Sequence, residues 1–125
     1  MAAKNPASRP RYVGIELRFG PNTEFFQYLD GRGKTAKYRK PKIQKSATSY
    51  VEFTSQVFGK GPTHGAPFSV HFKGLSPFEK GRYGSAGAPI QAHFRPDAQG
   101  GTYQYFVAVY EADRIWTDDP EIIVW

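Results

Sequence analysis

A cluster of basic side chains in residues 31–45 is the strongest chemical signal in the sequence. The segment reads GRGKTAKYRKPKIQK and holds seven of the chain's 17 Lys and Arg residues and no acid. The formal net charge of the whole chain is +6, so the other 110 residues together come to −1. Clustered cations raise the local electrostatic potential and attract phosphates or carboxylates. The sequence therefore predicts an anionic partner for this segment.

The predicted binding residues of this basic segment combine seven cations with one aromatic ring. If the backbone is extended from Lys37 onward, Tyr38 shares a face with Lys40 and Lys42. A ring beside a row of cations could stack on a nucleobase while the lysines contact phosphates. The candidate anion- or nucleic-acid-binding residues are Arg32, Lys34, Lys37, Tyr38, Arg39, Lys40, Lys42 and Lys45.

Other interpretations of the basic segment stay open. Lysines and a proline on an exposed edge strand prevent sheets from associating edge to edge, so edge protection alone could explain the segment. An acidic protein surface or a membrane surface would also attract these charges. The chain carries a net charge of −4 over residues 111–125. Self-assembly through basic-to-acidic contacts between subunits is therefore the alternative function, and it would make the protein a homo-oligomer.

Metal chemistry has little support in the sequence. Cysteine is absent, which excludes disulfides, thiolate nucleophiles and Cys-ligated metals. His64, His71 and His93 share no recognised ligand spacing, and the last two are expected to face away from their apolar neighbours. A site formed by His93 and an acidic residue is the remaining alternative. We predict neither a metal nor a cofactor.

Catalysis has only one set of candidate residues, a group of carboxylates near the end of the sequence. They are Glu111, Asp113, Asp118, Asp119 and Glu121. Paired acids can act as acid and base when burial separates their pKa values. Arg114 lies among them, and a solvated acidic loop is the preferred interpretation. The spacing of an EF-hand is absent, as are the P-loop, Rossmann, Gly-x-Ser-x-Gly and His-Glu-x-x-His motifs. We therefore expect a protein that is not an enzyme.

The elements that would position these residues are short strands. Several segments alternate apolar and polar residues, which is the pattern of a strand with one buried face. The expected strands are 13–19, 23–29, 50–58, 68–72, 89–94, 103–110 and 121–125. Residues 74–88 and 95–101 are rich in Gly and Pro and are expected to be loops. Seven or eight short strands without a helix predict an all-β fold, a single antiparallel Greek-key β-sandwich.

The length and composition fit one domain with a core built from aromatic rings. Phe, Tyr and Trp make up 16% of the 125 residues. Residues 1–10 are expected to be a flexible N-terminal lead-in and residues 11–125 the sandwich domain. The first residues lack the apolar stretch of a secretory signal, and no apolar run approaches the roughly 18 residues of a membrane span. A cytoplasmic location is the resulting expectation.

Parts of the predicted sandwich resemble cupredoxin-like domains. The segment Gly101–Val107 reads Gly-Thr-Tyr-Gln-Tyr-Phe-Val, and Asp119–Val124 follows as a closing strand. Pro67–Gly74 with Ser76-Pro77-Phe78 is similar to the strand and loop before that family's variable region. Val13–Phe19 fits its opening strand. A Gly-x-Tyr-x-Tyr strand also recurs in immunoglobulin-like sandwiches, so the resemblance implies a cupredoxin-like or an immunoglobulin-like sandwich.

The resemblance does not extend to the copper ligands of the cupredoxins. A blue-copper site needs a Cys thiolate, two His and usually a weak axial Met. Val107 stands at the Cys position, Tyr110 stands at the position of the following His, and Met1 is the only methionine. The resemblance thus implies a cupredoxin-like domain that lacks the copper ligands.

Overall fold

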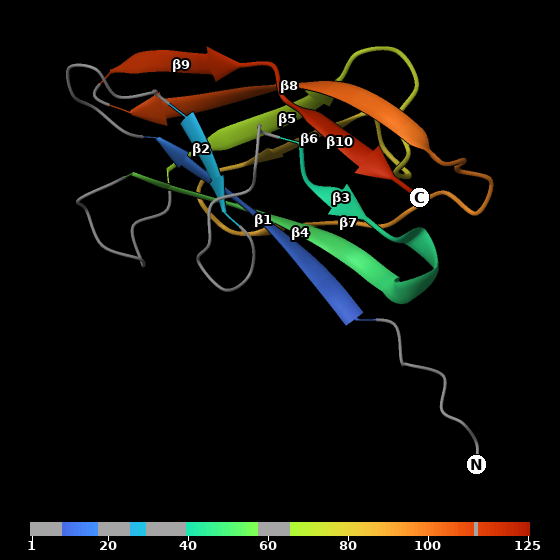
Figure 1. Cartoon of the computed structure of the whole chain (residues 1–125). Helices are drawn as coiled ribbons and strands as arrows, with labels where there is room; N and C mark the ends of the chain where they lie inside the picture. Colours follow the sequence, from blue (N-terminus) through green and yellow to red (C-terminus); the bar gives the residue numbers. More distant parts are fainter. Residues whose placement is uncertain (1–8, 18–25, 30–39, 58–65, 112) are drawn as a thin grey trace.

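A computed structural model of the chain describes residues 9–17, 26–29, 40–57, 66–111 and 113–125. These residues form an all-β sandwich of two sheets, as predicted, with ten strands and one short 3-10 helix, η2 (Lys45–Ala47) (Figure 1). The alternation in the sequence explains the two layers. Along 51–57 every second side chain is buried, and the residues between them are only partly covered.

The first sheet is built around a long parallel pair. Its strand order is β2-β1-β4-β7, with bounds Phe26–Leu29, Arg9–Leu17, Thr48–Val57 and Ile90–Ala92. The parallel ladder between β1 and β4 extends from Arg9, opposite Thr48, to Leu17, opposite Val57. β2 and β7 pair antiparallel to the outer sides of this central pair.

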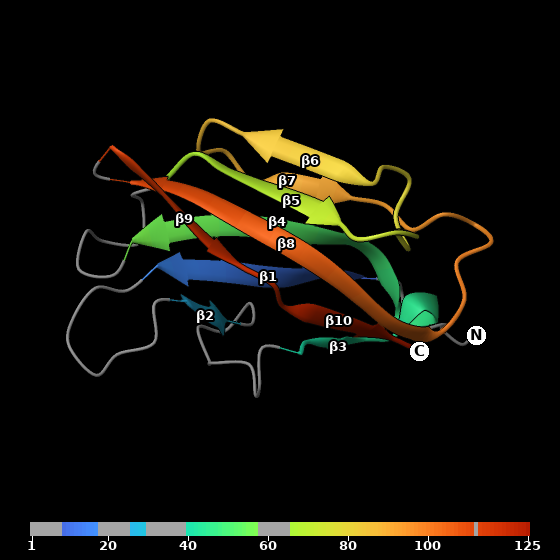
Figure 2. The ribbon, with the colours of Figure 1, turned by 90° about the horizontal axis from the view of Figure 1, so that it is seen from above.

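The second sheet is organised by the longest strand, β8 (Gly101–Glu111). The strand order is β3-β10-β8-β5-β6, in which the other bounds are Lys42–Ile43, Glu121–Val124, Phe68–Phe72 and Arg82–Ser85. A further strand, β9 (Arg114–Asp118), pairs with residues 107–111 of β8, and β10 pairs with residues 101–104. Between them the carbonyl oxygen of Pro120 accepts a hydrogen bond of 3.1 Å from Tyr105 N. β9 and β10 therefore follow one another along the same side of β8 (Figure 2).

The core between the sheets is rich in aromatic rings. The ring of Tyr105 lies 6.0 Å from that of Phe53 and 5.2 Å from that of Phe72, centroid to centroid. Phe78 contacts both phenylalanines, and its ring packs edge-on against each. These contacts join β4 in one sheet to β5 and β8 in the other. The expectation of a core built from rings is confirmed.

The sandwich differs from the expectation in its pairing and in the number of its strands. β1 pairs with β4 and β3 with β10 in parallel, so the sheets are mixed and not purely antiparallel. β6 forms within the segment 74–88, which was expected to be a loop. β6 is an edge strand in which only Tyr83 packs against the core, so its sequence lacks the alternating apolar pattern of the inner strands. β1 begins at Arg9, inside the expected lead-in. No helix in the described ranges is long and apolar enough to cross a membrane.

Candidate anion-binding surface

The structure describes three of the eight predicted binding residues, namely Lys40, Lys42 and Lys45. The other five, Arg32, Lys34, Lys37, Tyr38 and Arg39, lie outside the described residues. The described end of the basic segment is paired with β10. Ile123 N donates to Pro41 O at 2.9 Å, and Trp125 N donates to Ile43 O at 3.0 Å. The segment thus ends in β3, beside the last strand and near the C-terminus in Figure 1.

An open cavity of about 1070 Å³ lies beside this ladder, and we call it the basic hollow. It is lined by three cations from separate segments, and residues 99–104 at the start of β8 form another part of its wall. Lys40 comes from just before β3, Lys73 follows β5, and Arg95 follows β7. Two acids, Asp97 and Glu121, also line it. The fold therefore brings two cations from outside the basic segment, Lys73 and Arg95, into the same cavity as Lys40.

Each cation of the basic hollow has a carboxylate nearby. Lys40 Nζ lies 3.2 Å from a Glu121 oxygen, and Lys73 Nζ lies 3.4 Å from an Asp119 oxygen. Both lysine side chains remain about half exposed, at 52% and 45%. Ion pairs of this exposed kind contribute about 0–1 kcal/mol. These ion pairs position the two lysines. A phosphate or carboxylate that replaces the internal acid breaks an interaction that contributes little free energy.

Glu121 is the acid most closely tied to these cations. The hydrogen bond from Lys40 lowers the pKa of the Glu121 carboxyl below its ordinary value, and the hydrogen bond from the Gln104 amide lowers it further. The Gln104 Nε2 atom donates to Glu121 Oε2 at 3.3 Å. Glu121 is thus held in its charged form, and it orients Lys40 along the edge of the basic hollow.

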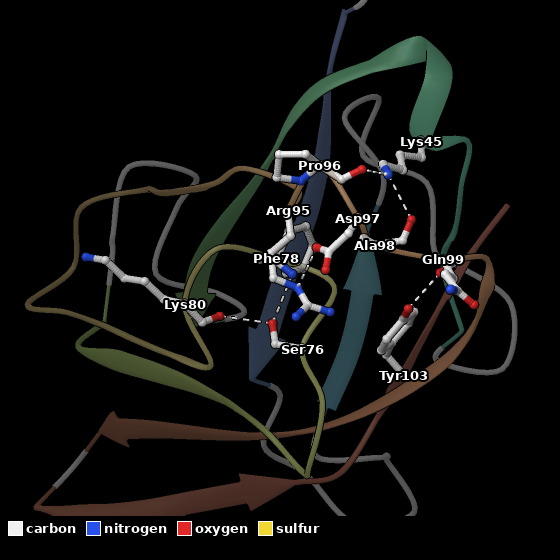
Figure 3. A network of polar contacts seen from close by, with 10 residues as sticks. All are labelled: Lys45, Ser76, Phe78, Lys80, Arg95, Pro96, Asp97, Ala98, Gln99 and Tyr103. Atoms are coloured by element: carbon white, nitrogen blue, oxygen red, sulfur yellow. Dashed lines mark hydrogen bonds and ion pairs between the residues drawn. The ribbon is translucent and has the colours of Figure 1, made fainter.

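The turn that forms one wall of the basic hollow is held by side chains from elsewhere in the fold. Lys45 Nζ donates to the carbonyl oxygens of Pro96 at 2.9 Å and Ala98 at 2.8 Å (Figure 3). The Tyr103 hydroxyl donates to Gln99 O at 2.6 Å. Lys45 therefore positions the wall of the hollow. Its role as a direct ligand of an anion stays a prediction.

Arg95 brings a buried donor to the same wall. Its Nε atom is buried and has no hydrogen-bond partner among the described residues. The nearest acid, Asp97, has an oxygen 3.9 Å from Nε, which is too far for a hydrogen bond. The backbone around Arg95 is fixed, because its N–H donates to Pro77 O at 3.0 Å and its carbonyl accepts from Ala98 N at 3.1 Å. Figure 3 shows the guanidinium between the turn 95–99 and the loop that contains Ser76.

A second, smaller cavity of about 470 Å³ lies beside Lys42, and we call it the Trp125 groove. Its lining consists of Arg11, Lys42, Gln44, Ile123 and Trp125. Trp125 is 64% exposed. No acid is among these five residues, in contrast to the basic hollow. Lys40 and Lys42 thus belong to neighbouring cavities of different character.

Sequence reasoning missed three cations of this surface, namely Arg11, Lys73 and Arg95. Each stands outside residues 31–45, and none is part of a local charge run. They approach Lys40 and Lys42 only because β1, β5 and β7 end or begin at this side of the sandwich. No local signal in the sequence could have identified them.

The histidines do not converge in the part of the chain that the structure describes. His71 Nε2 lies 3.2 Å from Ser69 Oγ, and its ring packs against Phe106. His93 is exposed beside the ring of Tyr50. Both face away from their buried neighbours, as predicted, although β7 ends at Ala92, just before His93. His64 lies outside the described residues, and within these residues no three His, Asp or Glu side chains form a group that could hold a metal.

The five carboxylates proposed as catalytic candidates are divided between two places. Glu111 and Asp113 lie at the turn between β8 and β9, and the other three lie where β9 meets β10. The length of β9, about 15 Å, separates these places. The expected acidic loop is wrong, because residues 114–118 form β9, in which Trp116 packs against the core. At its end, Asp118 accepts a hydrogen bond from the Tyr28 hydroxyl at 2.8 Å.

Comparison with known proteins does not assign the chain to a family. No protein-family model matches the chain, and no curated protein matches it.

Proposed function

We propose that this protein is a non-enzymatic binding module that holds an anionic partner, a nucleic acid or an acidic protein surface, against the basic hollow. One observation carries the proposal: Lys40, Lys73 and Arg95 come from three distant segments and line one open cavity. Lys40 is also one of the cations of the basic segment 31–45. Clustered cations raise the local potential and attract phosphates or carboxylates.

The order of the cavity wall supports a binding role. Lys45 and Tyr103 fix the turn 95–99 through hydrogen bonds to its carbonyl groups, and the N–H of Arg95 donates to Pro77 O outside the turn. A wall that is already ordered loses little conformational entropy when a partner binds. The weak ion pairs of Lys40 and Lys73 support the same role, because an incoming anion replaces a carboxylate that contributes little to stability.

For the fold, we propose a cupredoxin-like sandwich without the copper ligands, and an immunoglobulin-like sandwich is the alternative. The segments that carry the resemblance lie in β1, β5, β8 and β10, and all four belong to the same sandwich. Val107 is fully buried and Tyr110 is 51% exposed, on the opposite face of β8. A thiolate and an imidazole at these two positions would point to opposite sides of the strand.

Self-assembly remains the second candidate function, and one observation favours it. Phe106, Tyr110 and Ile115 are exposed on the outer face of β8 and β9, where Tyr110 and Ile115 are direct cross-strand neighbours. The charge-based contact between subunits has less support. Two of the five acids it would use, Asp119 and Glu121, already pair with Lys73 and Lys40 in the same chain.

The test compares two double variants of equal net charge. Lys40→Gln with Lys73→Gln removes two cations of the basic hollow. Arg82→Gln with Arg114→Gln removes two exposed cations elsewhere, and Arg114 lies about 30 Å away at the far end of β8. Binding is measured by fluorescence anisotropy at several salt concentrations, with an oligothymidylate of about 15 nucleotides and with polyglutamate as probes.

We expect the hollow variant to bind at least one probe about tenfold more weakly than the wild type and with a smaller salt dependence. The control variant should bind as the wild type does. An equal loss in both variants would reduce the effect to net charge and overturn the assignment of the site. Failure of both probes to bind the wild type at low salt would overturn the proposed function.

A further inference from the structure

We infer that the Trp125 groove is a base-stacking subsite, which makes the anionic partner a single-stranded nucleic acid. This inference rests on the proposed function and specifies its partner. Trp125 presents an exposed indole ring beside Ile123, with Arg11 and Lys42 in the same lining. A flat ring with cations nearby can bind both parts of a nucleotide, because the base stacks on the ring and the phosphate pairs with the cations.

The charge of the groove is complementary to a phosphate. Arg11 and Lys42 form no ion pair with any described residue, and no acidic side chain is among the described residues that line the groove. In the basic hollow, by contrast, each cation already has a carboxylate within 3.9 Å. An anion that enters the groove therefore displaces no carboxylate of the described residues from these two cations.

The ring of Trp125 stands on an ordered backbone. Trp125 N donates to Ile43 O at 3.0 Å, and Trp125 O accepts from Lys45 N at 2.8 Å. These two hydrogen bonds continue the parallel ladder of β3 and β10, in which Lys42 is the direct neighbour of Ile123. A stacking residue held in this way loses only side-chain freedom on binding. The ladder also fixes the position of Lys42 relative to the ring.

The groove and the basic hollow are close enough to serve one strand. Lys40 lines the hollow and Lys42 lines the groove, and two residues span at most about 7 Å. A partner that stacks one base on Trp125 can therefore direct its next phosphates toward Lys40 and Lys73. Bases within a duplex are already stacked on one another, so an exposed indole selects an unpaired strand. An acidic protein would use the cations but has no base to place on the ring.

The test separates the base from the phosphate. An oligothymidylate of about 15 nucleotides is compared with an abasic strand of the same length, which carries the phosphates without the bases. Two variants, Trp125→Ala and Trp125→Phe, are measured against the wild type, and circular dichroism checks their fold. The chain has two tryptophans. The variant Trp116→Phe therefore leaves Trp125 as the only fluorescent indole.

We expect Trp125→Ala to bind the oligothymidylate about 10- to 100-fold more weakly, while its affinity for the abasic strand stays unchanged. Trp125→Phe should retain most of the affinity, because a phenyl ring still stacks. In Trp116→Phe, the oligothymidylate should quench the fluorescence and the abasic strand should not. Lys42→Gln should weaken binding of both strands alike, since both carry phosphates.

Three outcomes would overturn the inference. If Trp125→Ala binds both strands as the wild type does and no quenching occurs, the groove does not stack bases. The proposed function still stands in that case if Lys40→Gln with Lys73→Gln weakens binding. If only polyglutamate binds, the partner is an acidic protein surface. If no probe binds, the inference and the proposed function both fail.

Discussion

Two tyrosine hydroxyls in the core differ in their hydrogen bonding. Tyr28 donates to an Asp118 oxygen at 2.8 Å, whereas the Tyr105 hydroxyl is fully buried and has no hydrogen-bond partner in the described part of the chain. Burial raises the pKa of Tyr105 well above its ordinary value of 10.0, and the charge of Asp118 raises it further. A buried hydroxyl without a partner costs about 1–3 kcal/mol. The Tyr105 hydroxyl therefore lowers the free energy of unfolding relative to a phenylalanine at the same position.

We predict opposite effects on stability for the two matched variants. Tyr105→Phe removes an unpaired hydroxyl and should raise the free energy of unfolding by up to about 1 kcal/mol. Tyr28→Phe removes a paired hydroxyl and should lower it by about 1–2 kcal/mol. Urea unfolding at neutral pH measures both changes. A loss of equal size in the two variants would show that the Tyr105 hydroxyl has a partner after all.

The same pair of residues gives the direction of a pH effect. The unfolded chain ionises Tyr105 near its ordinary pKa of 10.0, and the folded chain does so only at higher pH. Ionisation of Tyr105 in the unfolded chain therefore lowers the free energy of unfolding as the pH rises above 10, and this loss is absent below pH 10. Tyr105→Phe should therefore lose less stability than the wild type when unfolding is repeated above pH 10.

At the scale of the elements, η2 and the turn 95–99 are joined by one side chain. Lys45, the first residue of η2, donates to two carbonyl groups of the turn that follows β7. These bonds tie the end of the basic segment to the wall of the basic hollow, although some fifty residues separate them in sequence. The position of the wall thus depends on Lys45, which the charge pattern alone predicted to bind an external anion.

We predict that Lys45→Met lowers the free energy of unfolding by about 2 kcal/mol, because two charged hydrogen bonds are lost. Lys42→Met is the matched control and should change stability by less than about 0.5 kcal/mol, since Lys42 is exposed. Chemical denaturation measures both variants, and amide hydrogen exchange should show faster exchange at Ala98. Equal stability of the two variants would contradict the structural role of Lys45.

The sequence predicted those elements whose pattern is local. The alternation in β4, β5 and β8 could be read directly, because each has one face in the core and a fixed period of two. The parallel partners of β1 and β3 could not be predicted, since pairing depends on residues far away in the chain. β9 was missed because only Trp116 among its five residues packs against the core.

The candidate site, too, was predictable only where its residues form a local pattern. Residues 31–45 stood out as one charge run and led to Lys40 and Lys42. Arg11, Lys73 and Arg95 join them only through the fold, so no local pattern marks them. Trp125 could be noted as an aromatic residue near the end of a strand, but the cations beside its ring come from β1 and β3.

At the scale of the whole molecule, the charged and the apolar surfaces lie in different places. The basic hollow and the Trp125 groove adjoin the start of β8 and the end of β10. Tyr110 and Ile115 are exposed at the other end of β8, on its outer face. Ligand binding and self-assembly would thus use separate surfaces, and one can be altered without the other.

We expect the protein alone to sediment as a single chain at low salt. Lys40 and Lys73 are engaged within the chain, and three exposed apolar side chains fall short of the roughly 800 Å² per partner that a stable interface buries. Analytical ultracentrifugation at several concentrations measures this. A larger species that dissociates in salt would support assembly through charge. One that persists in salt and is lost in Tyr110→Ser with Ile115→Ser would support assembly through the outer face.

The parallel pairing of β3 with β10 has a consequence for biosynthesis. Lys42 leaves the ribosome about 80 residues before Ile123, its neighbour in the ladder. At a synthesis rate of about 5–20 residues per second, the nascent β3 is without its partner strand β10 for roughly 4–16 s. The wall that Lys45 supports and the ring of Trp125 beside Lys42 reach their final positions only after this wait. The synthesis of β10, more than the emergence of the basic segment, sets the moment at which the binding surface is complete.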